Sequence, residues 1–297
     1  MNKGAEHGKQ SPGDWGRVGA KKSLGQNFLK SRSVLADIVL AAELKSSDTV
    51  LEIGPGKGTL TASLLETGAK VIAVEKDDRL IPLLQEKFAK EIKSGRFELV
   101  HADILKISPS TLLGATSFKL VANIPYYITG QILRKFLTAE IKPELVVLMI
   151  QKEVALRIVG KDAKRPERSR RTKESLLSLS VKVYGVPKII KTVPKSFFKP
   201  RPKVDSAILK ISNISGDFFN LEARLPSSRA EQKFFEMIKL GFSSKRKMLL
   251  GNLKNFKWRD DLATKKVFEI CGINEKARAE DLKIADWACL VEKSVDK

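Results

Sequence analysis

Five short apolar runs alternate with helix-like stretches over residues 49–153 of this 297-residue chain. The runs read TVLEIG, KVIAVEKD, RFELVHAD, FKLVANIP and LVVLMIQKE. The intervening stretches GTLTASLLETG and RLIPLLQEKFAKEI repeat their apolar residues at the spacing of an amphipathic helix. Strands that alternate with helices favour βαβ units, so we expect an α/β fold whose parallel sheet carries helices on both faces. Such sheets bind ligands at the carboxyl ends of their strands.

The character of the sequence changes after residue 161. Residues 161–171 are charged and interrupted by proline, and PKIIKTVPKSFFKPRPKVDSAILKI reads as two extended segments joined by a proline-rich loop. From about residue 217 the apolar spacing is helical. We therefore predict a disordered basic leader at residues 1–20, an α/β domain at residues 21–215 and a small all-α domain at residues 216–297.

The formal net charge of +21 indicates a polyanionic partner, because such an excess only repels itself in an isolated fold. The basic residues are spread along the chain without an amphipathic basic helix at either end, which favours nucleic acid over an anionic membrane. Residues 161–171 and the triplet Lys245, Arg246 and Lys247 are candidates for contact with RNA phosphates. The alternative for both is a solvated charged surface.

Counts of specialised residues exclude several kinds of site. Two cysteines, Cys271 and Cys289, are too few for a disulfide framework or a cysteine-based zinc site. With two histidines, we expect neither a Ser-His-Asp triad nor a histidine-rich metal site, and we predict no metal. The longest apolar runs, such as LVVLMI, are too short to span a bilayer, and no apolar signal segment opens the chain. We expect a cytoplasmic monomer without a membrane partner.

The stretch LEIGPGKGTLT follows one predicted strand and opens a helix. Gly54, Gly56 and Gly58 allow a tight turn and a close approach of the backbone to a ligand. Glu75 ends the next strand about 20 residues later, where a carboxylate can accept hydrogen bonds from both ribose hydroxyls. The alternative is a structural turn with a surface glutamate.

The glycine spacing distinguishes between nucleotides. A dinucleotide fingerprint is G-x-G-x-x-G, whereas this loop is G-x-G-x-G and has Thr59 at the last position. Glu52 directly precedes the loop, where it would repel a pyrophosphate but suits the charged amino acid end of S-adenosylmethionine. Asp103 ends another strand and is placed for the adenine of that donor. The spacing favours a Rossmann-like domain that binds S-adenosylmethionine.

The stretch VANIPYYITGQIL places an amide, a proline and two tyrosines directly after an apolar run. The side-chain oxygen of Asn123 and a backbone carbonyl, expected to be that of Ile124, could hold the exocyclic amine of adenine with its lone pair free. Tyr126 could stack on the purine. Catalysis would then be mostly positioning. The alternative is a strand-to-helix turn with an aromatic lid.

The chain resembles the bacterial 16S ribosomal RNA adenine N6,N6-dimethyltransferases. The motifs that carry the resemblance are KSLGQNFL, LEIGPGKGTLT, VIAVEKD, HADIL, NIPYYITGQIL, MIQKEVALRI and VPKSFFKPRPKVDSAILK, in order along the chain. The resemblance implies methylation of the N6 of two adjacent adenosines in the 3′-terminal hairpin loop of 16S RNA, during maturation of the small ribosomal subunit. One departure is Glu174, which stands where the family usually has tyrosine.

The resemblance also implies roles for individual residues. Asn27 and Leu29 of GQNFL are expected to contact the donor, together with Gly54, Glu75, Asp103 and Asn123. Phe198 corresponds to a second aromatic that sandwiches the adenine against Tyr126. Its neighbour Phe197 is expected to be the core residue of that pair.

Three other functions stay open. A 23S RNA adenine methyltransferase of the macrolide-resistance type would share the donor loop and the target pocket. A non-catalytic RNA-binding assembly or transcription factor could use the same fold. A nicotinamide-dependent oxidoreductase is disfavoured by the glycine spacing and by the missing catalytic histidine.

Overall fold

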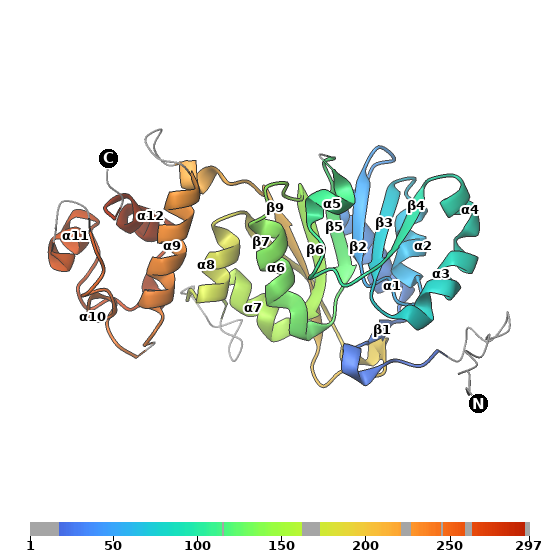
Figure 1. Cartoon of the computed structure of the whole chain (residues 1–297). Coiled ribbons are helices and arrows are strands. Elements are labelled where there is room, and N and C mark those ends of the chain that lie inside the picture. Colours follow the sequence, from blue (N-terminus) through green and yellow to red (C-terminus); the bar gives the residue numbers. More distant parts are fainter. Residues whose placement is uncertain are drawn as a thin grey trace, which may run out of the picture.

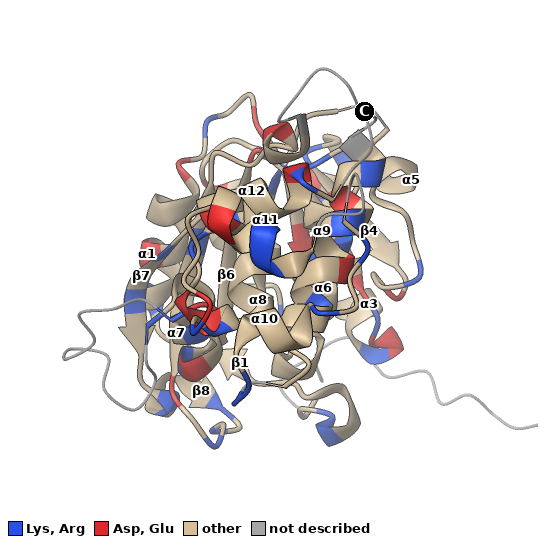
Figure 2. Ribbon diagram, turned by 90° about the vertical axis from the view of Figure 1, so that its left-hand side faces the viewer, with Lys and Arg blue, Asp and Glu red and all other residues tan. Residues whose placement is uncertain are grey.

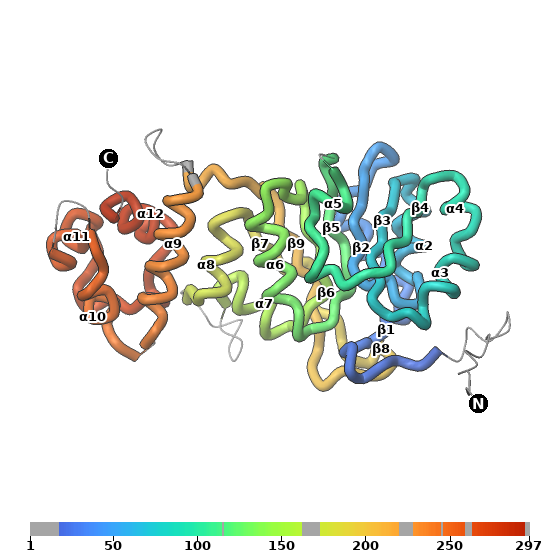
Figure 3. Tube along the Cα trace, viewed as in Figure 1, coloured from blue at the N-terminus to red at the C-terminus, as the bar shows by residue number. Residues whose placement is uncertain are grey.

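The computed structural model describes residues 18–114, 116–161, 173–220, 227–244, 246–258 and 263–294. Its centre is a seven-stranded sheet of order β4-β3-β2-β5-β6-β9-β7 (Figure 1). The strands are β2 (Thr49–Ile53), β3 (Lys70–Glu75), β4 (Phe97–His101), β5 (Lys119–Asn123), β6 (Leu145–Gln151), β7 (Val186–Val193) and β9 (Ser206–Ser212). A separate small sheet pairs β1 (Phe28–Leu29) with β8 (Phe198–Lys199), and the two run side by side in Figure 3.

The five apolar runs form β2 to β6, which are parallel as the sequence predicts. The two extended segments around the proline-rich loop form β7 and β9, which add antiparallel strands at one edge. The chain lays down β2, β3 and β4 in one direction and then returns to the other side of β2 with β5. Strand order therefore reverses between β2 and β5, which is where open α/β sheets bind their ligands.

Helices cover both faces of the sheet, as predicted. They are α1 (Arg32–Ala42), α2 (Thr59–Leu65), α3 (Ile81–Lys87), α4 (Ala89–Lys93), α5 (Pro109–Leu113), α6 (Thr129–Leu137), α7 (Lys152–Val159) and α8 (Leu176–Lys182). Successive strand residues point to opposite faces, and the two hydrophobic cores follow that alternation. Val50 and Val71 share a core with α1, α2 and α3, whereas their neighbours Leu51 and Ile72 share a core with α6, α7 and α8.

The C-terminal part is helical, with α9 (Ser227–Gly241), α10 (Leu249–Asn252), α11 (Thr264–Ile270) and α12 (Ile284–Glu292). These helices lie at one end of the sheet domain, beyond α8 (Figure 1). Phe234 and Trp287 belong to the same buried core as α6 to α8, so the helical part packs continuously onto the sheet domain. A domain boundary between residues 215 and 216 stays a prediction. Figure 2 shows acidic and basic residues together on this end of the molecule.

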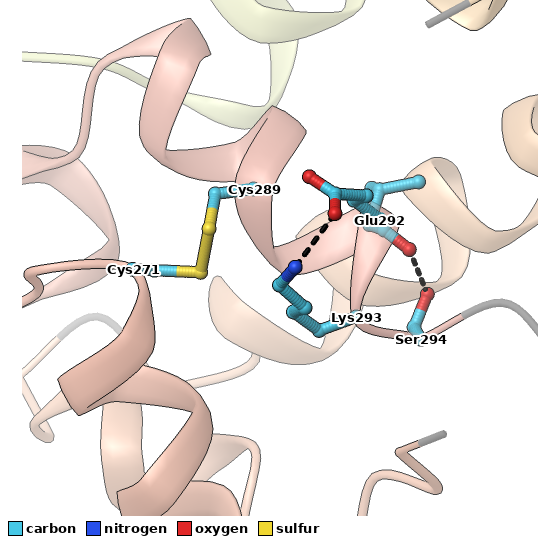
Figure 4. Close-up of a disulfide and its surroundings, with 6 residues drawn as sticks. Cys271, Cys289, Glu292, Lys293 and Ser294 are labelled. Carbon is cyan, nitrogen blue, oxygen red and sulfur yellow. Dashed lines mark hydrogen bonds and ion pairs between the residues drawn. A yellow bond between two sulfur atoms is a disulfide. The ribbon is translucent and has the colours of Figure 1, made fainter. Parts of the chain in front are cut away.

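The expectation drawn from the cysteine count needs correction, because the two cysteines form a disulfide bond (Figure 4). Cys271 directly follows α11 and Cys289 lies within α12, with their Cα atoms 5.8 Å apart. The connection between the two helices, which includes a 3-10 helix at Ala279–Asp281, brings together residues that are 18 positions apart in the chain. The number of cysteines does not show whether two of them lie close together in the fold. Two cysteines are enough for one disulfide bond once they are in contact.

Some predictions fall outside the described residues: those for residues 1–17 of the leader, for residues 162–171 of the basic loop and for Lys245. Arg246 and Lys247 are described, and both are exposed. Within the described ranges, no helix is both long and apolar enough to cross a membrane. Nor do three or more His, Cys, Asp or Glu side chains gather there in a group suited to a metal ion.

Substitution of Gly241 tests the packing of the helical part. A Cβ atom at Gly241 would lie 2.7 Å from the Trp287 ring and 2.9 Å from Leu249, and both of these side chains are fully buried. We expect Gly241→Ala to lower the free energy of unfolding by about 1–3 kcal/mol in urea denaturation. Gly251→Ala is the matched control, since its Cβ meets nothing within 4 Å and should stabilise α10 by about 0.5–1 kcal/mol. Equal stability of the two variants would contradict the packing described.

Candidate active site

A cavity opens where the strand order reverses. It is lined by residues 24–29, 52–57, 74–76, 102–105 and 123–128, with Leu35, Thr59 and Leu60. These segments come from the N-terminal stretch and from the carboxyl ends of β2, β3, β4 and β5. The structure therefore brings together Gly54, Glu75, Asp103, Asn123 and Tyr126, which the sequence predicts as residues of the site.

The glycine loop needs its glycines for two different reasons. Gly54 has a φ of +66°, and a Cβ atom there would meet nothing within 4 Å, so its backbone borders open space on the cavity. Gly58 has a φ of +68°, and a Cβ there would lie 2.5 Å from the Phe88 ring. The first glycine leaves room for a ligand, whereas the second allows α3 to pack against the loop.

Glu75 lies at the centre of the loop's hydrogen bonds. Its Oε1 accepts hydrogen bonds from the backbone N–H groups of Lys76 and Asp77, at 2.9 and 2.8 Å. Its Oε2 accepts one from the N–H of Gly56 at 3.1 Å. The side chain is 4% exposed, and this burial raises the pKa of the carboxyl group. Oε2 retains an acceptor position, so the carboxylate can still receive a ligand hydroxyl.

Glu52 lies deeper below the same loop, and is 1% exposed. Its Oε2 accepts a hydrogen bond from the Thr61 hydroxyl at 2.7 Å. Burial raises the pKa of Glu52 to about 8, because a charged carboxylate is poorly solvated there. The nearby Lys87 donates from Nζ to the carbonyl oxygens of Lys57 and Gly58, at 2.9 and 3.0 Å, which fixes the far end of the loop.

Asp103 borders the cavity from the segment after β4. Its Oδ2 receives a hydrogen bond from Lys76 Nζ at 2.9 Å, and Oδ1 receives one from the N–H of Leu105 at 3.0 Å. The bond from Lys76 lowers the pKa of Asp103, so the side chain is ionised at neutral pH. An ionised carboxylate at this rim is a hydrogen-bond acceptor for an amino group.

Asn123 and Tyr126 are each held by one polar contact. Asn123 Nδ2 donates to the backbone carbonyl of Asn27 at 3.2 Å, which leaves the side-chain Oδ1 as the free end of the amide. The Tyr126 hydroxyl bonds the Ser206 hydroxyl at 2.6 Å, and burial raises the pKa of this phenol. The amide and the aromatic ring thus have fixed orientations on the cavity wall.

Comparison with known proteins assigns the chain to a family. The profile described as ribosomal RNA adenine dimethylase matches residues 18–296. The chain belongs to the ribosomal RNA adenine dimethylase family. A relative from Dehalococcoides mccartyi, named ribosomal RNA small subunit methyltransferase A, is 42% identical over 92% of this chain and 88% of its own length. One of the same name from Clostridium botulinum is 40% identical over 91% and 92%.

Two solved structures resemble this dimethylase-family chain over most of its length. One is titled a dimethyladenosine transferase from Plasmodium falciparum, with 29% identity and a TM-score of 0.70 over 89% of this chain and 95% of that one. The other is titled 23S rRNA methyltransferase ErmE, with 28% identity and a TM-score of 0.68 over 90% and 99%. The Rossmann-like methyltransferase fold is therefore confirmed.

The residues named from the dimethylase resemblance fall into two groups. Asn27 and Leu29 line the cavity, from the N-terminal stretch and β1. Phe198 does not, because its ring is 4% exposed and belongs to the core that contains Leu29 and Val193. Phe197 is the exposed member of the pair, so the prediction that it packs in the core is wrong. The polar neighbours of Phe198 are indeed exposed, but β8 alternates its faces and turns this ring inward.

Sequence reasoning missed one polar contact beside the cavity. Gln26 Nε2 donates to Asp77 Oδ2 at 2.8 Å, between residues 51 positions apart. Asp77 is 1% exposed, and Arg79 binds both of its oxygens at 2.8 and 2.6 Å. The bond from Arg79 lowers the pKa of Asp77 to about 2. Gln26 lies inside the family motif GQNFL, which was the available signal, but the motif does not reveal its partner.

The raised pKa of Glu52 predicts a specific dependence of stability on pH. Between the ordinary value of 4.5 and the folded value of about 8, the unfolded chain loses this proton while the folded chain keeps it. Stability from this group is therefore complete below pH 4.5 and is lost as the pH rises to 8. The free energy of unfolding of the ligand-free protein, measured in urea, should fall between pH 5 and pH 8. In Glu52→Gln this fall should be smaller by roughly 3–5 kcal/mol.

The exposed Glu66, which follows α2, supplies the matched control. Glu66→Gln should keep the pH dependence of the unaltered protein. If Glu52→Gln also keeps it, Glu52 is ionised in the folded chain and the burial argument fails.

Proposed function

We propose that this chain transfers methyl groups from S-adenosylmethionine to the exocyclic N6 of two adjacent adenosines in the 3′-terminal hairpin loop of 16S rRNA, during maturation of the small ribosomal subunit. The observation that carries the proposal is the Asn123 amide. Its Nδ2 is bound to the Asn27 carbonyl, so its Oδ1 is presented at the edge of a cavity built by the glycine loop. The relatives at 40–43% identity, all named small subunit methyltransferases, favour the small subunit as the substrate.

The residues of the cavity fit the proposed methyl donor. The backbone at Gly54 borders open space, and Glu75 keeps an acceptor position for a ribose hydroxyl. The Asp103 carboxylate suits the amino group of an adenine. Glu52 suits an ammonium group, which would draw its buried carboxyl towards the charged form. When bound, S-adenosylmethionine supplies a methyl group on a positively charged sulfur atom.

The chain's own residues position the target amine. The Asn123 Oδ1 and the Ile124 carbonyl accept its two hydrogens, which turns the nitrogen lone pair away from the ring and frees it to react. Tyr126 stacks on the base, and its bond to Ser206 keeps the ring from rotating away. Phe198 is only 4% exposed and packs in the core, so we assign it to the support of β1 and not to the second face of the base. Rate enhancement then comes from positioning.

Transfer of labelled methyl groups tests the function. Unmethylated small subunits and, separately, large subunits are incubated with labelled donor and enzyme, and the modified bases are mapped. We expect label on two adjacent adenosines of the 16S hairpin and none on 23S RNA. Label confined to 23S RNA would show an enzyme of the macrolide-resistance type. Tight RNA binding without any label would show an assembly factor, and either result would overturn the proposal.

Asn123→Ala tests the role of the amide. We expect the rate of methyl transfer to fall by about 100-fold or more, since an acceptor that acts on the reacting amine is lost. Binding of S-adenosylhomocysteine, measured by calorimetry, should persist because the glycine loop is intact. Asn274→Ala, at an exposed turn of the helical part, is the control and should keep the full rate. A rate within tenfold of the unaltered enzyme would rule out the proposed contact.

A further inference from the structure

The N-terminal segment, residues 21–29, contacts the chain after β2, after β3 and after β5, three of the strand ends around the cavity. The Phe28 ring lies against Gly56 of the glycine loop, where a Cβ atom would be 3.0 Å from it. A Cβ atom at Gly25 would likewise lie 3.0 Å from the Tyr127 ring. Leu29 pairs with Phe198 across the small sheet. One short stretch of chain therefore borders both the donor side of the cavity, formed by the glycine loop and the chain after β3, and the target side, formed by residues 123–128.

Gln26 ties this segment to the donor side. Its Nε2 donates to Asp77, and its Oε1 accepts a hydrogen bond from the backbone N–H of Lys21 at 2.8 Å. Both ends of the amide are therefore engaged. Asp77 is a rigid partner, because Arg79 holds both of its oxygens and its own N–H is bound to Glu75. A bond to an ionised acceptor of this kind is stronger than one between neutral groups.

The next residue ties the segment to the target side. The carbonyl of Asn27 accepts the hydrogen bond from Asn123 Nδ2. Among the described residues, the Asn123 amide makes no other side-chain hydrogen bond, so the position of the Asn27 carbonyl sets which way that amide faces. The position of the carbonyl depends in turn on the anchoring of the adjacent Gln26.

We propose that Gln26 is a positioning residue for methyl transfer: its bond to Asp77 holds the N-terminal segment so that the Asn27 carbonyl orients the Asn123 amide towards the target amine. The proposal rests on the function proposed above and deepens it. In this proposal the N-terminal segment links Asp77, beside the donor-binding Glu75, to the Asn123 amide, which binds the base. The donor side and the target side are thus aligned through two consecutive residues.

A double-mutant cycle tests this positioning role. Gln26→Leu removes both amide contacts at nearly constant volume. We expect kcat for methylation of unmethylated small subunits, at saturating donor, to fall by about 10- to 100-fold, the effect of a misplaced reacting group. In an Asn123→Ala background, measured in single turnover with excess enzyme, the same change should alter the residual rate less than twofold. The effect disappears there because the amide that Gln26 orients is already gone.

The matched control is Ser23→Ala, at an exposed position of the same segment that does not line the cavity, and this variant should keep the full rate. If Gln26→Leu does not fold, as judged by circular dichroism, Gln26→Ala takes its place in the cycle. A rate within twofold of the unaltered enzyme would overturn the proposal. So would an equal fold-loss in both backgrounds, which would indicate a general structural role. The unaltered enzyme must itself methylate the subunits, and its failure to do so would refute the proposed function instead.

Discussion

The reversal of strand order between β2 and β5 is the constraint on which the site depends. Because parallel strands all end at one edge of the sheet, the segments after β2, β3, β4 and β5 converge there. The connections leave in opposite directions on the two sides of the reversal, so a cavity opens between them. The proposed chemistry is placed here because polar residues end these strands, Glu75 and Asn123 among them, and their side chains border the cavity.

Three buried acidic side chains, Glu52, Glu75 and Asp77, lie at or near the glycine loop of a strongly basic chain, and each is stabilised differently. Glu52 is deeply buried with a single hydroxyl donor, so it holds its proton. Glu75 receives three backbone N–H groups, which offset part of the cost of its burial. Asp77 is paired with Arg79 and Gln26, and stays ionised. Because Glu52 is protonated, it does not repel the neighbouring carboxylates, so the acidic side chains can lie close together.

The positions of the five parallel strands along the chain were readable from the sequence, because buried parallel strands require apolar runs. Their spatial order and the antiparallel pairing of β7 and β9 were not. The polar residues at the strand ends were readable for the converse reason, since packing does not explain them. What could not be read depends on contacts between distant positions, such as Gln26 with Asp77 or Cys271 with Cys289. The sequence assigned the core position to Phe197, whereas Phe198 occupies it. This error has a local cause, because a strand of two residues is too short for its alternation to show in the sequence.

Catalysis by positioning requires that the side chains around the reacting groups are held rigidly, and it does not require a strong acid or base. Within the described part of the chain, the residues that line the cavity include no histidine or cysteine. Under the proposed mechanism, the orientation of Asn123 must persist through each turnover, and one hydrogen bond at 3.2 Å would not secure it alone. The carbonyl that receives this bond belongs to a segment fixed at Asp77, at Gly56 and through β8. The rigidity of the amide thus originates in contacts made outside the target pocket, and this is the physical basis for the role that we propose for the N-terminal segment.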